Sequence, residues 1–93
     1  MAYELRFTAT AVKQLRKLDR TIATRVVDYF EAVADLEDPT VRGKNLTGEY
    51  GGIWRYRIGS YRALCDVDSR ALTILTLEVS HRSRSYKSSA ATP

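Results

Sequence analysis

The hydrophobic pattern changes period near Arg42, and no other feature constrains the fold as strongly. Before this point, apolar residues recur at helical spacing, first over Ala11 to Leu18 and then over Ile22 to Leu36. After it, apolar and polar residues alternate as they do in half-buried strands. A pair of helices followed by a run of strands is typical of an α+β domain, in which helices cover one face of an antiparallel sheet.

The first part of the chain is predicted to form one strand and a two-helix hairpin. Apolar and charged residues alternate from Tyr3 to Phe7, which predicts the strand. Thr8 or Thr10 can cap the first helix, because a hydroxyl oxygen at the N-cap accepts a hydrogen bond from an N–H group of the first turn. The second helix is expected to run to Asp38-Pro39, since proline disfavours a continuing helix.

Three further strands are predicted as an antiparallel meander, at about Ile53–Ile58, Tyr61–Val67 and Ala71–Val79. The link Gly59-Ser60 suits a two-residue hairpin turn. We therefore expect a single α+β domain over residues 1–87, with both helices packed on one sheet face and nothing left in the chain to cover the other. Residues 88–93 are expected to form a flexible C-terminal tail.

The register of the first hairpin predicts a positively charged open face. Side chains alternate across a strand, so the aromatic side of the first meander strand belongs under the helices, while Arg55 and Arg57 point to the other face. A two-residue turn pairs Ile58 with Tyr61. The same register sets Arg57 directly opposite Arg62. Like charges in opposed positions destabilise a sheet, so folding alone gives little reason for them.

The last strand of the meander is expected to add little counter-charge to this face. A three-residue loop, Asp68 to Arg70, would set Thr76 across from Arg62, with Glu78 diagonal to it. On this strand the core face is predicted to hold Leu75, Leu77 and Val79. Two interpretations follow: Glu78 neutralises Arg62 and the other arginines are solvated, or the missing counter-charge is the phosphate of a ligand.

The composition excludes several classes of function. Of the 93 residues, 44% are apolar and 28% are charged, as in an ordinary soluble globular chain. One Cys and one His leave no four-ligand zinc site within the chain, and we expect no metal and no other cofactor. No apolar run approaches the roughly 20 residues that span a bilayer and the N-terminus lacks a signal pattern, so we expect a cytoplasmic protein with no membrane partner.

Two motifs, together with the order of the elements, resemble the RelE family of toxins from bacterial toxin–antitoxin pairs. The motifs are Gly48 to Val67 (GEYGGIWRYRIGSYRALCDV) and Val79 to Lys87 (VSHRSRSYK). The resemblance runs from about Tyr3 to Lys87, nearly the whole chain. It implies an endoribonuclease that cuts messenger RNA in the ribosomal A site and is held inactive by a cognate antitoxin.

The resemblance also implies roles for individual residues. Arg55 and Arg57 stand where the family has its basic strand pair, and Arg62 matches its phosphate-binding arginine. Tyr86 matches the tyrosine near the C-terminus that acts on the 2′-hydroxyl. Cys65 departs from the pattern, because a tyrosine is common at that position in the family.

The chemistry of RNA cleavage asks for the same groups. An RNA strand carries its own nucleophile, so a metal-free ribonuclease needs a base for the 2′-hydroxyl, positive charge for the crowded phosphate and an acid for the leaving 5′-oxygen. Tyr86 is the candidate base, since neighbouring cations favour the phenolate. The acid is either His81, which chemistry favours because the pKa of arginine exceeds about 12, or Arg82, which the resemblance favours. Arg84 and Lys87 are expected to bind RNA phosphates.

Two rival functions come from other classes. A toxin of the ParE type resembles this fold and acts on DNA gyrase, but it generally lacks the arginine set and the terminal tyrosine. A non-catalytic RNA-binding module could use Trp54 and Tyr56 as stacking platforms, although their place in the alternation puts them in the core instead.

Overall fold

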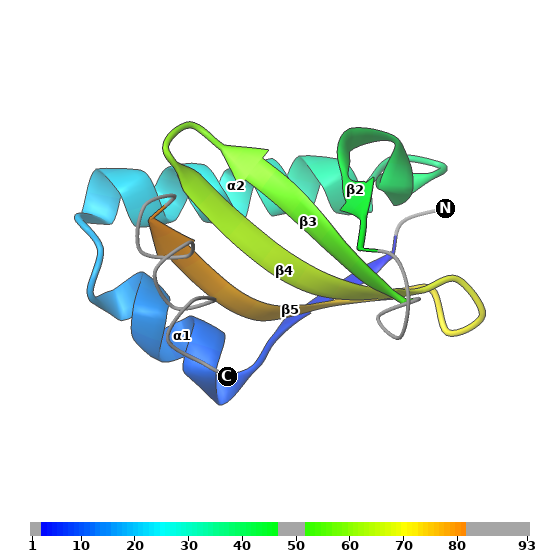
Figure 1. The fold of residues 1–93 in the computed structure, drawn as a ribbon, viewed down its shortest axis with the longest axis horizontal. Helices are drawn as coiled ribbons and strands as arrows, with labels where there is room; N and C mark the ends of the chain where they lie inside the picture. The colour runs from blue at the N-terminus through cyan, green and yellow to red at the C-terminus, as the bar shows by residue number, and fades with distance from the viewer. Residues whose placement is uncertain (1–2, 47–51, 82–93) are drawn as a thin grey trace.

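The computed structural model describes residues 3–46 and 52–81. Its elements are, in chain order, β1 (Glu4–Phe7), α1 (Ala9–Arg16), α2 (Arg20–Ala34), the short 3₁₀ helix η1 (Pro39–Arg42), β2 (Lys44–Asn45), β3 (Ile53–Ile58), β4 (Tyr61–Asp68) and β5 (Thr73–His81). The strands form one five-stranded sheet in the order β1-β5-β4-β3-β2 (Figure 1). Neighbouring strands are antiparallel except β1 and β5, which are parallel. Within the described residues, no helix is both long and apolar enough to cross a bilayer.

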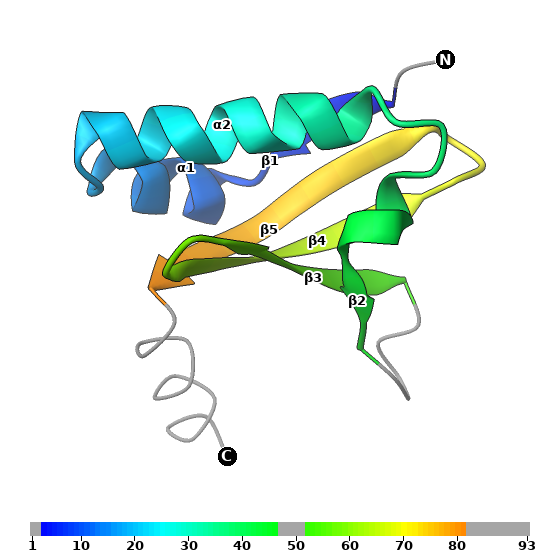
Figure 2. The ribbon, with the colours of Figure 1, turned by 90° about the horizontal axis from the view of Figure 1, so that it is seen from above.

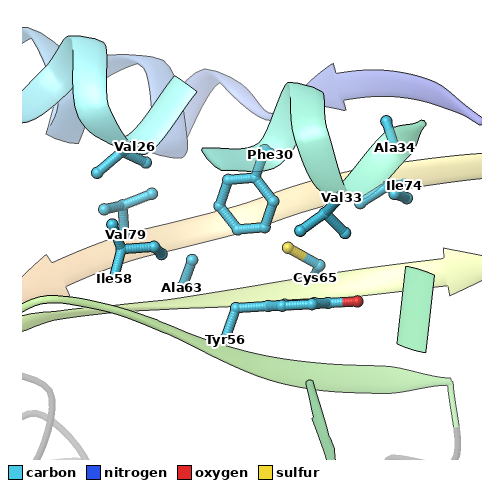
Figure 3. Close-up of a cluster of buried hydrophobic side chains, with 10 residues drawn as sticks. All are labelled: Val26, Phe30, Val33, Ala34, Tyr56, Ile58, Ala63, Cys65, Ile74 and Val79. Carbon is cyan, nitrogen blue, oxygen red and sulfur yellow. The ribbon is translucent and has the colours of Figure 1, made fainter. Parts of the chain in front are cut away.

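Both long helices lie on the same side of the sheet, as Figure 2 shows. The predicted α+β fold is therefore confirmed. The apolar stripe of α2 points at the sheet and brings Phe30 against Tyr56 of β3, with ring centroids 5.4 Å apart in an edge-to-face arrangement (Figure 3). The hydroxyl of Tyr56 donates to the carbonyl of Pro39 at 2.8 Å, so this fully buried polar group has a partner. The prediction that Tyr56 is a core residue is confirmed.

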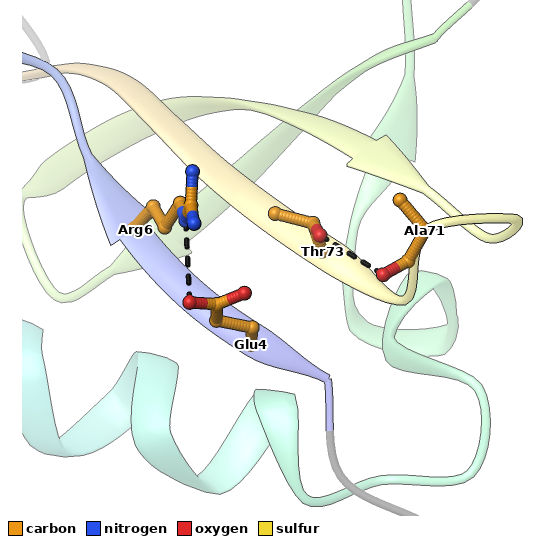
Figure 4. A network of polar contacts seen from close by, with 4 residues as sticks. All are labelled: Glu4, Arg6, Ala71 and Thr73. Atoms are coloured by element: carbon orange, nitrogen blue, oxygen red, sulfur yellow. Dashed lines mark hydrogen bonds and ion pairs between the residues drawn. The ribbon is translucent and has the colours of Figure 1, made fainter.

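The first and last strands of the chain are neighbours in the sheet. Glu4 pairs with Thr73 and Phe7 with Thr76, so β1 runs beside the first half of β5 only. Figure 4 shows the two strands, with Arg6 Nε 3.3 Å from Glu4 Oε2 on β1 and the Thr73 hydroxyl donating to the Ala71 carbonyl at 3.1 Å. Beyond Thr76, helix α1 and its N-cap contact the edge of β5 in place of a strand.

The second helix ends earlier than the sequence pattern indicates. It stops at Ala34, so Leu36 lies outside it, and Asp38-Pro39 begins the 3₁₀ helix η1 instead of ending α2. Asp38 is the N-cap of η1, and its carboxylate accepts from the N–H of Thr40 at 3.0 Å. Proline is favoured in the first turn of a helix, where its missing N–H costs nothing. The predicted end of the second helix is wrong because this pair starts a new helix.

Thr8 joins helix α1 to the part of the β5 edge that lies beyond β1. Its hydroxyl oxygen accepts from the N–H of Ala11 at 3.1 Å, and the same hydroxyl donates to the carbonyl of Leu77 at 2.7 Å. Of the two predicted caps, the structure uses Thr8, while Thr10 is exposed inside the helix.

Replacing Thr8 by alanine is expected to lower the free energy of unfolding by about 1–2 kcal/mol, because both hydrogen bonds are lost at once. Urea unfolding measures this change. Thr10→Ala is the matched control and should be neutral or slightly stabilising, since alanine has the higher helix propensity. Equal losses from the two substitutions would contradict the assignment of Thr8 as the cap.

Candidate nucleic-acid interface

Three arginines of β3 and β4 lie close together on the sheet face that the helices leave uncovered. Arg57 of β3 pairs directly with Arg62 of β4, which confirms the predicted register. Arg55 lies two residues before Arg57, on the same face, and pairs with Leu64. Opposed residues have Cβ atoms about 4.5–5.5 Å apart, so side chains from two strands can reach one anionic group between them. Arg57 is exposed, whereas Arg55 and Arg62 are half-buried.

Lys44 joins these three arginines from an element that was not predicted. Strand β2 has only two residues, and its Lys44 pairs with Arg55 at the edge of the sheet. Paired residues project to the same face, so exposed Lys44 lies beside the arginines. Two residues are too few for alternation to reveal a strand, and only the charge of Lys44 was visible in the sequence. We call Lys44, Arg55, Arg57 and Arg62 the basic face.

The last strand is arranged differently from the prediction. The loop between β4 and β5 has four residues, Ser69 to Leu72, and not the predicted three, because Asp68 pairs with Thr73. The residue opposite Arg62 is Ser80 and not Thr76. The pairs Leu64–Glu78 and Cys65–Thr76 leave Leu77 without a partner, which is a β-bulge. Alternation shifts by one residue at a bulge, so a pattern carried straight through it assigns the wrong face.

The bulge changes which side chains face the core. Thr76, predicted on the open face, is fully buried, and Leu75, predicted in the core, pairs with exposed Asp66 on the open side. The prediction that Val79 is buried is confirmed. Glu78 pairs with Leu64 and is therefore diagonal to Arg62, as predicted. The predicted register, however, set it diagonal in the other direction along the strand, toward Ser60.

His81 lies away from the basic face. It pairs with Tyr61, and the two rings meet edge to face with centroids 5.2 Å apart. Tyr61 shares its side of β4 with buried Ala63, so the His81 ring is on the helix-covered side of the sheet, while Arg62 points to the other. The structure brings Arg55, Arg57 and Arg62 together and places His81 on the opposite side of the sheet, at the end of β5.

The other predicted site residues are Arg82, Arg84, Tyr86 and Lys87, and all of them lie outside the described residues. Their roles remain predictions.

Cys65 is a core residue without access to the basic face. It is fully buried, and its thiol donates to the hydroxyl of Thr76 at 3.6 Å. Burial raises the pKa of the thiol to about 12, since the charged form is poorly solvated there. The prediction of an inert core cysteine is consistent with both observations.

The chain has relatives of known family. A family model described as the ParE toxin of the type II toxin–antitoxin system parDE matches residues 5–86. Toxin RelG of Mycobacterium tuberculosis is 39% identical over 88 residues, which cover 94% of this chain and 99% of that protein. Toxin RelE of the same organism is 29% identical over 91 residues, covering 98% and 93%.

A solved structure has the same fold and a related sequence. It is the crystal structure of the toxin–antitoxin complex RelBE2 from Mycobacterium tuberculosis, in which one chain is 36% identical to this one with a TM-score of 0.78. The superposition covers 88% of this chain and 100% of the other. Because fold, family model and relatives agree over nearly its entire length, the chain belongs to the RelE/ParE superfamily of toxins from type II toxin–antitoxin systems.

Proposed function

We propose that this toxin is a metal-independent endoribonuclease that cuts messenger RNA, in the ribosomal A site, by attack of the strand's own 2′-hydroxyl. One observation carries the proposal: Arg57 is directly opposite Arg62, with Arg55 and Lys44 on the same uncovered face. Opposed like charges cost stability, and a bound phosphate removes that cost by supplying the opposite charge. The relatives named RelG and RelE support this proposal, because the resemblance to the RelE family implies cleavage of RNA.

The basic face is suited to the charge that builds up during cleavage. In the transition state the phosphate becomes crowded with negative charge, and preorganised cations stabilise that state more than the ground state. At an effective dielectric of about 20, two unit charges 4 Å apart attract by about 4 kcal/mol before desolvation is counted. Arg62 is the central member, because it is opposite Arg57 and diagonal to Arg55.

The proton transfers are assigned to the C-terminal motif. Tyr86 takes the proton of the 2′-hydroxyl, with Arg82, Arg84 and Lys87 favouring its phenolate. Of the two candidate acids, His81 lies on the helix-covered side of the sheet, away from the arginines. We therefore favour Arg82 as the group that supports the leaving 5′-oxygen, with Arg84 and Lys87 binding flanking phosphates.

The toxin is proposed to work with two macromolecular partners in the cytoplasm. A domain of this size has little surface with which to orient a flexible strand, so ribosomal RNA is expected to hold the message in place. A cognate antitoxin is expected to neutralise the basic face with acidic side chains. The solved relative in complex with its antitoxin supports the second partner.

The proposed chemistry predicts the ends of the products. Messenger RNA cut on programmed ribosomes should carry a 2′,3′-cyclic phosphate upstream and a 5′-hydroxyl downstream, because no water molecule attacks in this step. End-specific ligation and mass spectrometry measure both ends. EDTA added after the ribosomes are washed into a magnesium-free polyamine buffer should leave the rate unchanged within about twofold. A 3′-hydroxyl with a 5′-phosphate would exclude the mechanism.

A gyrase-directed function is the second candidate, because the matching family model is described as a ParE toxin. The two are separated by one comparison: inhibition of DNA supercoiling by purified toxin, measured beside cleavage of a programmed message. We expect cleavage and no inhibition. Inhibition without cleavage would favour the gyrase-directed function.

A further inference from the structure

A cavity of about 530 Å³ lies at the end of the sheet, between the last turn of α1 and the last residues of β5. Its wall includes Gln14 from α1, Lys17 at the C-cap of that helix, Tyr61 from the start of β4, and Ser80 and His81 from the end of β5. This volume is within the range of small-molecule and nucleotide sites. It lies on the helix-covered side, so it is separate from the basic face.

The cavity begins one residue pair beyond Arg62. Arg62 pairs with Ser80, which also lines the cavity, and the next pair along the two strands is Tyr61 with His81. Among the described residues no strand continues the sheet at this point, because β1 pairs only with the first half of β5 and ends opposite Thr76. Helix α1 covers the edge of β5 as far as Val79, whose N–H donates to Gln14, so a polymer held by Arg62 would reach the cavity past Ser80, at the end of the two strands.

The side chains of the wall suit a nucleotide. Tyr61 and His81 present two aromatic rings, which stack on bases of any sequence. The side-chain oxygen of Gln14 accepts from the N–H of Val79, and this bond fixes an amide group at the wall. Lys17 adds a positive charge for a phosphate.

The helix beside the cavity carries only positive charge. Helix α1 has the sequence ATAVKQLR, which contains two cations and no acid, and Lys17 follows at its C-cap. Lys13 and Lys17 are four residues apart and thus on the same face, where like charges repel. The helix dipole favours a cation in the last turn, but it explains neither the aromatic pair nor the cavity.

We propose that this cavity binds a nucleotide of the messenger strand next to the one whose phosphate lies on the basic face. The inference rests on the proposed function and extends it: the toxin binds its substrate on the basic face and also in the cavity on the helix-covered side of the sheet. The base packs against Tyr61 and His81, and its phosphate lies near Lys17.

The test measures binding of the full chain to ribosomes programmed with a message that carries a 2′-deoxynucleotide at the cut position. Lys17→Gln is expected to weaken binding and to reduce the slope of log K against log salt by about 0.7, as for one lost phosphate contact. Tyr61→Leu should weaken binding roughly fivefold or more, and Tyr61→Phe should restore it, because a ring is kept. Arg70→Gln, an exposed charge in the β4–β5 loop, is the matched control and should bind as the wild type does.

A photo-cross-link identifies the RNA. With 4-thiouridine placed next to the cut position, the message should cross-link to Tyr61 or His81, and Lys17→Gln should reduce the yield. Wild-type affinity and salt slope for Lys17→Gln, or a message that cross-links to other toxin residues and not to Tyr61 or His81, would overturn the proposal. The proposal would also be overturned if Lys17→Gln and Tyr61→Leu lost antitoxin binding but kept ribosome binding, since the cavity would then bind the antitoxin and not RNA.

The outcomes separate this inference from the proposed function. If wild-type toxin cleaves the all-ribose message and Lys17→Gln binds normally, only the inference is wrong. If wild-type toxin never cleaves on programmed ribosomes, the proposed function itself is wrong.

Discussion

Replacing Arg62 by alanine is expected to slow cleavage on programmed ribosomes by about 10²–10³-fold, as for the loss of one preorganised group that stabilises developing charge. Arg62 has this effect because of its position: it is half-buried, directly opposite Arg57 and diagonal to Arg55. Single-turnover rates at saturating ribosome concentration measure the loss in the chemical step.

Two further variants separate charge from fold. Arg62→Lys keeps the charge but loses the bidentate geometry of the guanidinium group, so it should retain only part of the rate. Arg70→Ala removes an exposed arginine from the β4–β5 loop and should cleave at the wild-type rate. Arg62→Lys and Arg70→Ala should unfold at urea concentrations similar to that of the wild type, and Arg62→Ala at a similar or higher one, because it removes the repulsion with Arg57. An Arg62→Ala protein that stays folded and fully toxic would place the site elsewhere.

A single 2′-deoxynucleotide at the cut position is expected to abolish cleavage, because it removes the oxygen that attacks the phosphate. This effect is larger than the one expected for Arg62→Ala, since no other group can replace an absent nucleophile. The toxin should still bind the modified message, because the phosphate and the base are unchanged. Primer extension after incubation with ribosomes and toxin measures the cut fraction.

Moving the deoxynucleotide provides the control. Placed two nucleotides away from the cut position, it should leave cleavage within a fewfold of the all-ribose rate. Cleavage that persists when the 2′-hydroxyl at the cut position is missing would mean that water or a protein side chain attacks the phosphate. The endoribonuclease proposal would then need a different mechanism.

The hairpin of β3 and β4 could be predicted in detail because its information is local. The Gly59-Ser60 link fixes the pairing of Ile58 with Tyr61, and every later pair follows from it, including Arg57 with Arg62. Alternation then assigns Tyr56 to the core and the arginines to the open face. A wrong register would have buried charge, so the sequence allowed only one answer.

The sequence by itself determined the two α-helices, the four longer strands, the α+β class and the pairing of Arg57 with Arg62 on the basic face. The tertiary structure decided what depends on residues far apart in the chain: β1 beside β5, Lys44 beside Arg55, and the bulge at Leu77 that buries Thr76. It also decided that His81 lies with Tyr61 on the helix side, away from Arg62. The physical reason is that periodicity describes one strand at a time. Bulges, pairings at the edge of the sheet and the face on which a residue at a strand end lies are set by packing between elements.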